Sequence, residues 1–139
     1  MFHHILVPLD FTPKNAAALR AAQEAAEAWN ARVTLVHVIE RIEHIPPRAL
    51  RAFYDTLTAT ARVRMARAAQ RLSRAGRPAR QVILFGKRGP SLLRYVVLNK
   101  VDLVVLASHR VRPDGSRHVW ATLSYQLAVL APCPVLLVK

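Results

Sequence analysis

The sequence predicts an α/β fold of a single domain over residues 1–139: an open, Rossmann-like parallel five-stranded sheet with helices on both faces. Short apolar runs rich in β-branched residues alternate with alanine-rich or amphipathic stretches, in the order βαβαβαβαβ. Alternation of this kind requires parallel strands and right-handed crossovers, which place helices on both faces. A chain of 139 residues also suits one hydrophobic core.

The first three elements follow from local patterns. The apolar run "HILVPLD" predicts a buried strand at about 4–9. Thr12 and Pro13 are typical of an N-cap and a first helical turn, and the alanine-rich stretch behind them predicts a helix at about 13–30. "RVTLVHVIE" then predicts a second strand at about 32–39.

A second, longer helix is expected at about 48–75, ended by Gly76 and Pro78. Three- and four-residue steps predict its buried stripe, which consists of Phe53, Leu57, Ala61, Met65, Ala68 and Leu72. A separate basic stripe consists of Arg64, Arg67, Arg71 and Arg74.

The remaining elements are shorter. "RQVILF" predicts the third strand, and "GKRGPS" is a turn that opens a helix at about 90–99. "VDLVVLA" predicts the fourth strand, and a helix follows at about 117–131. Pro132 and Pro134 end that helix, and "VLLV" predicts a fifth strand, which needs cover if it forms an edge of the sheet.

Positive charge dominates the composition. Lys and Arg number 21 against 8 Asp and Glu, which gives a net charge of +13. The stretch from Thr56 to Val101 contains no acidic residue at all. Such a field attracts anions, so nucleotides, nucleic acids and acidic membrane surfaces are the partner classes to consider.

The sequence favours a cytoplasmic protein. Its apolar runs are far shorter than the roughly 18 residues of a membrane span, and its first residues enter a strand without a basic leader segment. Its single cysteine, Cys133, rules out an internal disulfide, which agrees with a reducing compartment.

Ligands of open parallel sheets bind at the carboxyl ends of the strands. The segments to consider are therefore Pro8–Thr12, Val38–Glu40, Gly86–Ser91 and Ala107–Thr122. Asp10 could accept hydrogen bonds from a ligand or from backbone donors of its own turn. Ser108 and His109 are neighbours without an acid placed to orient the histidine, and His3 and His4 make no metal set, so neither a catalytic triad nor a metal site is expected.

Four stretches in order resemble the universal stress protein family: "ILVPLDFT", "VTLVHVIE", "DLVVLASHR" and "LAPCPVLLVK". The resemblance covers the whole chain and implies the strand order 3-2-1-4-5. It implies a homodimer through the fifth strand and, in members that bind it, ATP as a ligand. Family binders contact the nucleoside at positions that match Pro8, Leu9, Asp10 and Val38 here.

The phosphate-binding loop departs from the family pattern Gly-x2-Gly-x9-Gly-(Ser/Thr). Ala107 stands at the first glycine, Arg110 at the second, and Ala121, one position late and followed by Thr122, at the third. Added Cβ atoms hinder the close approach of backbone amides to phosphates, and Arg110 would not readily adopt a positive φ. The sequence therefore predicts a non-enzymatic stress protein, with no required cofactor, that binds ATP weakly or not at all.

Two alternatives stay open. A rebuilt site could hold ATP or AMP through basic side chains, with Lys87, Arg88 and Arg110 on the phosphates. The basic stripe of the second helix could instead attract nucleic acid or another polyanion without sequence specificity.

Overall fold

A computed structural model describes residues 1–73, 78–108 and 122–139. The strands are β1 (His4–Pro8), β2 (Arg32–Ile39), β3 (Arg80–Phe85), β4 (Leu103–Ala107) and β5 (Val135–Val138). The helices are α1 (Asn15–Trp29), α2 (Arg51–Ser73), α3 (Arg88–Leu98) and α4 (Leu123–Leu130), and a short 3-10 helix, η1 (Pro47–Leu50), precedes α2. Within these described ranges, no helix is long and apolar enough to cross a membrane.

The strands form one parallel sheet in the order β3-β2-β1-β4-β5, which confirms the predicted fold class and strand order. β1 lies at the centre, with Ile5 opposite Val33 of β2 and Leu103 of β4. The sheet order reverses between β1 and β4, so the carboxyl ends of these two strands flank the point where ligands of such sheets bind.

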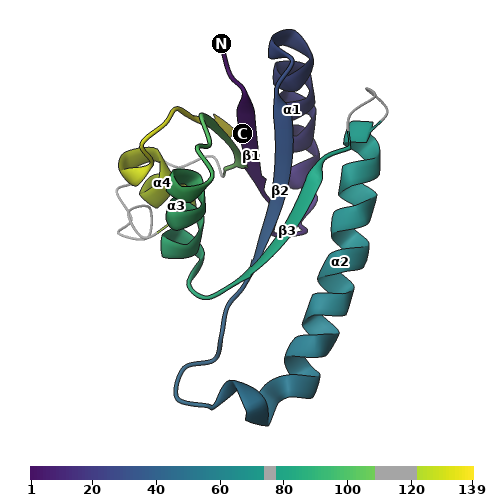
Figure 1. The fold of residues 1–139 in the computed structure, drawn as a ribbon, viewed down its shortest axis with the longest axis vertical. Coiled ribbons are helices and arrows are strands. Elements are labelled where there is room, and N and C mark those ends of the chain that lie inside the picture. Colours follow the sequence, from purple (N-terminus) through teal and green to yellow (C-terminus); the bar gives the residue numbers. More distant parts are fainter. Residues whose placement is uncertain (74–77, 109–121) are drawn as a thin grey trace.

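Each face of the sheet has its own apolar core, and successive residues of a strand alternate between the two. Ile5 and Val7 pack under α1 and α2, whereas Leu6 packs under α3 and α4. Figure 1 shows the two helix pairs on opposite sides of the sheet. Burial on both faces explains why β1 and β4 read as uninterrupted apolar runs.

The predicted apolar stripe of α2 is wrong at its N-terminal end. Ala61, Met65 and Leu72 are buried as expected, but Phe53 is 47% and Leu57 38% exposed. In Figure 1 the lower part of α2 runs past the end of the sheet, so no strand lies beneath its first turns. The buried residue at that end is instead Tyr54, whose hydroxyl accepts a hydrogen bond from the Ile42 backbone N–H at 2.8 Å.

The predicted start of the first helix is also wrong. α1 begins at Asn15, and its N-cap, Lys14, makes no side-chain capping bond. The hydroxyl of Thr12 donates to Asp10 Oδ1 at 2.7 Å, so it is occupied in the preceding turn. The fourth helix was expected from about 117, but residues 117–121 lie outside the described part, where α4 begins at Leu123.

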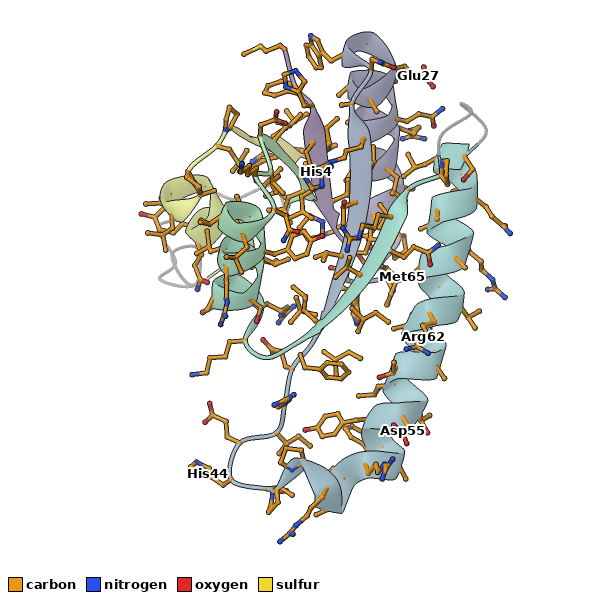
Figure 2. All side chains as sticks on the ribbon, viewed as in Figure 1. His4, Glu27, His44, Asp55, Arg62 and Met65 are labelled. Atoms are coloured by element: carbon orange, nitrogen blue, oxygen red, sulfur yellow. The ribbon has the colours of Figure 1, made fainter. Side chains whose placement is uncertain are left out.

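A histidine is buried at the opposite end of the sheet from the predicted ligand site. His4 is 4% exposed, and its ring nitrogens lie 2.8 Å from the Thr34 hydroxyl and 3.1 Å from the Asn99 carbonyl oxygen. Burial lowers the pKa of His4, and the charge of Arg32 lowers it further, against the opposite effect of the Asn99 carbonyl. Figure 2 shows His4 within the layer of side chains around the sheet.

The free energy of unfolding is therefore expected to fall as the pH is lowered from about 7.5 to 5.5. Below the ordinary histidine pKa of 6.5, the unfolded chain takes up a proton at position 4 that the folded chain resists. The unfolded state then binds more protons, and stability rises with pH. Urea titrations across this range measure the slope, which His4→Gln should make shallower. If the unfolding free energy of His4→Gln had the same slope against pH as that of the parent protein, the pH dependence would come from other groups.

Candidate functional site

The carboxyl ends of β1, β2 and β4 open into one cleft of about 1020 Å³, which extends to the first turns of α1, α3 and α4. Of the sequence-predicted site residues, six line this cleft: Pro8, Leu9, Asp10, Val38, Ala107 and Thr122. The other two, Arg110 and Ala121, lie outside the described residues. Four further basic residues between β4 and α4 also lie outside the described residues: His109, Arg112, Arg117 and His118.

Asp10 organises the turn between β1 and α1. Its Oδ1 accepts hydrogen bonds from the backbone N–H of Thr12 at 3.0 Å and from the Thr12 hydroxyl at 2.7 Å. Burial raises the pKa of Asp10, but hydrogen bonds from Thr12 and Asn15 outweigh it and hold the pKa below its ordinary value. The carboxylate thus serves its own turn, and it stays charged at the edge of the cleft.

His37 of β2 holds the same turn in place. The His37 Nδ1 lies 2.7 Å from the Leu9 carbonyl oxygen. A carbonyl oxygen can only accept a hydrogen bond, so the Nδ1–H of His37 is the donor. Phe11 packs on the imidazole with ring centroids 4.3 Å apart and adopts φ = 62°. A positive φ at a bulky residue is rare and marks a turn held by its surroundings. His37 also lines the cleft, and sequence analysis did not single it out as a site residue.

Lys87 and Arg88, which the sequence offered as phosphate ligands, are already paired with carboxylates. Lys87 Nζ lies 3.4 Å from a Glu43 oxygen, and Arg88 Nε lies 3.3 Å from a Glu40 oxygen. All four side chains are at least half exposed, so each pair contributes at most about 1 kcal/mol. The pairs still bring two carboxylates to the place where phosphates were expected.

The first turns of α3 and α4 form one wall of the cleft. Thr122 caps α4, and its hydroxyl oxygen accepts a bond from the Tyr125 N–H at 3.3 Å. Gly86 has φ = 141°, a backbone conformation that side chains disfavour. A Cβ at Gly89 would collide with the amide of Gln126. Sequence reasoning missed Gly86, whose positive φ shapes the turn into α3, although "GKRG" places it just before that helix.

Within residues 1–73, 78–108 and 122–139, no three His, Cys, Asp or Glu side chains gather in a way that could hold a metal ion. Cys133 is half-buried, and burial raises the pKa of its thiol, which disfavours the reactive thiolate. Asp10 and His37 both line the cleft, and each is held in a structural hydrogen bond.

Comparison with known proteins identifies similar chains. The sequence profile of the Universal stress protein family matches residues 1–139. A universal stress protein of Thermus aquaticus, encoded in the 3′ region of the QAH/OAS sulfhydrylase gene, is 28% identical over 142 residues and covers 100% of both chains. The universal stress protein UspA of Lactobacillus plantarum superposes with a TM-score of 0.84 at 22% identity, over 99% of this chain and 98% of that one.

Several similar structures contain nucleotides. A universal stress protein in complex with cAMP has a TM-score of 0.80 at 17% identity, over 99% of this chain and 97% of that one. A universal stress protein family protein of Arabidopsis thaliana with AMP bound has a TM-score of 0.70 at 17% identity, over 99% of this chain and 91% of that one. At such identities the structures show a shared fold, while the profile match spans the whole sequence. The chain therefore belongs to the universal stress protein family.

Proposed function

We propose that this universal stress protein is not an enzyme and that it binds an adenine nucleotide weakly, through the nucleoside, with little contribution from the phosphates. The observation that carries this proposal is the charge of the cleft. Its described lining contains four cations, Lys14, Arg41, Lys87 and Arg88, against three carboxylates, Asp10, Glu40 and Glu43. This described part of the lining is nearly balanced in charge, and on its own it gives a triphosphate little electrostatic attraction.

The nucleoside end of the cleft supports binding. Pro8, Leu9 and Val38 provide an apolar floor beside the carboxylate of Asp10, and structures of the same fold hold AMP and cAMP. A mostly apolar pocket with a few polar groups is the usual form of a small-molecule site. The volume of about 1020 Å³ leaves room for a nucleotide.

The phosphate end supports weak binding. The sequence lacks all three glycines of the family loop, with Ala107, Arg110 and Ala121 in their places. A rebuilt site would need Lys87 and Arg88 to leave Glu43 and Glu40. A charge-assisted hydrogen bond, worth about 1.5–3 kcal/mol, could offset that loss, so the rebuilt site is the alternative to be tested.

Calorimetry with AMP and ATP at moderate salt separates these two functions. We expect weak binding of AMP and an ATP affinity within about threefold of it, because Lys87 and Arg88 are already paired with Glu43 and Glu40. ATP binding at least tenfold tighter than AMP would establish the rebuilt phosphate site instead. Binding of neither nucleotide at millimolar concentration would remove the nucleotide function altogether.

The proposal includes a homodimer in the cytoplasm, paired through β5. β5 is the edge strand beside β4, and its Leu136 side chain is 44% exposed. On the neighbouring helix α4, Val129 and Leu130 are 60% and 62% exposed. An edge strand with exposed apolar side chains is covered when it pairs with its two-fold mate. The single cysteine of the sequence supports a reducing compartment.

Leu136→Asp is expected to shift the protein from dimer to monomer, because the new charge would lie in the apolar contact. Leu137 is unsuitable for this test, since it packs against the buried cluster under α3 and α4. Sedimentation velocity measures the change, with Leu98→Asp on α3 as control at a side chain that is 68% exposed. A monomeric parent protein at tens of micromolar would end the dimer proposal.

A further inference from the structure

One face of α2 forms a continuous exposed stripe that no other described element covers. Steps of four and three residues align its members along the helix. They are Phe53, Leu57, Thr60, Arg64, Arg67 and Arg71, and each is exposed. We call this set the outer stripe; with a rise of about 1.5 Å per residue, it is about 27 Å long. Arg74, which sequence analysis added to the basic residues, lies outside the described part.

Burial of the adjacent face fixes the outer stripe in place. Ala61, Met65, Ala69 and Leu72 are buried against the sheet, and Figure 2 shows Met65 between α2 and β3. Tyr54 ties the projecting end of the helix to the loop after β2 through its bond with Ile42. These contacts fix the orientation of the helix, so the outer stripe stays on its exposed side.

Arginine charge on the outer stripe is not neutralised by neighbouring carboxylates. The ion pairs among the described residues involve Asp102, Glu43 and Glu40, and none of them includes Arg64, Arg67 or Arg71. The helix has no acidic residue after Asp55. Arg64 additionally lies over the ring of Phe11 at 5.6 Å, which holds its guanidinium in place. Like charges at these spacings destabilise a helix, so an anionic partner would relieve the repulsion.

The composition of the outer stripe changes along its length. The N-terminal half presents Leu57 and Phe53, which is 47% exposed. The Phe53 ring packs edge-on against the Tyr54 ring, with centroids 5.5 Å apart. The C-terminal half presents Arg64, Arg67 and Arg71. An exposed aromatic ring on the same helix face as a row of arginines fits an unpaired base on a strand whose phosphates meet the arginines.

We propose that the outer stripe binds single-stranded nucleic acid without sequence specificity, with Arg64, Arg67 and Arg71 on the phosphates and Phe53 stacked on a base. A membrane fits less well, since an interfacial helix carries its apolar face along its full length, whereas here apolar and basic residues follow one another along the axis. Duplex DNA fits less well, because its stacked bases would leave Phe53 without a partner.

Fluorescence anisotropy with a labelled 15-nucleotide oligo-dT, at 50 to 200 mM salt, tests the proposal. Three phosphate contacts predict a slope of about −2 for the logarithm of the association constant against that of the salt concentration. Arg67→Gln should weaken binding and make the slope shallower by about 0.7. Phe53→Leu, which keeps the apolar bulk, should weaken binding about five- to hundredfold.

Arg62→Gln is the matched control. Arg62 is exposed on the same helix, but its position two residues from Arg64 places it about 200° around the axis. We expect this variant to keep the parent slope. Equal losses in Arg62→Gln and Arg67→Gln would overturn the proposal in favour of diffuse attraction by net charge.

Competitors decide the class of partner. Oligo-dT should bind at least fivefold more tightly than a duplex of the same length, because only unpaired bases reach Phe53. Polyglutamate of equal charge and vesicles with one-third anionic lipid should compete weakly. Competition by either as strong as that of unlabelled oligo-dT would overturn the proposal, as would the absence of binding at 50 mM salt.

Discussion

Leu127→Ala is expected to lower the free energy of unfolding by about 2–5 kcal/mol, the range for removing a large side chain from a packed core. Leu127 is 0% exposed and packs in the cluster of buried residues under α3 and α4. It is also the buried residue of α4, which spans only eight residues. The contact between this short helix and the sheet therefore depends heavily on one side chain.

The same substitution is expected to weaken nucleotide binding, because α4 carries Thr122 and Ser124 into the cleft. Urea unfolding measures the stability, and calorimetry with AMP measures the binding. Leu98→Ala is the control, since Leu98 is 68% exposed on α3 and a surface substitution costs within about 0.5 kcal/mol. A loss below about 1 kcal/mol in Leu127→Ala would mean that α4 is held mainly by other contacts.

The parts of the fold that could be predicted are those that follow from local patterns. β1 and β4 are buried on both faces, so their apolar runs are continuous and easily recognised. Alternation with helices then fixes parallel pairing, and the resemblance to a family supplied the strand order. Six of the eight residues proposed for the site line one cleft because the carboxyl ends of neighbouring strands lie together.

The parts that could not be predicted depend on distant side chains. The periodicity of α2 does not reveal where the sheet ends beneath it, so Phe53 and Leu57 were assigned to the core although they are exposed. Arg88 meets Glu40 across 48 positions of sequence, and no local pattern indicates such a pair. The hydroxyl of Thr12 had two possible partners, the N-terminus of a helix and Asp10, and only the folded turn decides between them.

Asp10→Ala is expected to weaken AMP binding about ten- to hundredfold, the loss that follows when a hydrogen bond to a charged group, worth about 1.5–3 kcal/mol, is removed. Thr12 bonds to Oδ1 of Asp10, so the other carboxylate oxygen takes no part in those two bonds and can face the nucleoside. Because its hydrogen bonds keep the pKa of Asp10 below the ordinary value, the carboxylate is charged at neutral pH, and AMP affinity should not change through Asp10 between pH 6 and 8.

Thr12→Val separates the role of Asp10 in the turn from its role in binding. This variant removes the hydroxyl donor at 2.7 Å but keeps the carboxylate and the backbone bond from residue 12 at 3.0 Å. If Asp10 contacts the nucleoside, Thr12→Val should keep AMP affinity within about threefold of the parent while Asp10→Ala loses it. Equal losses in both variants, measured by calorimetry on proteins with unchanged thermal midpoints, would show that Asp10 acts only by shaping the turn between β1 and α1.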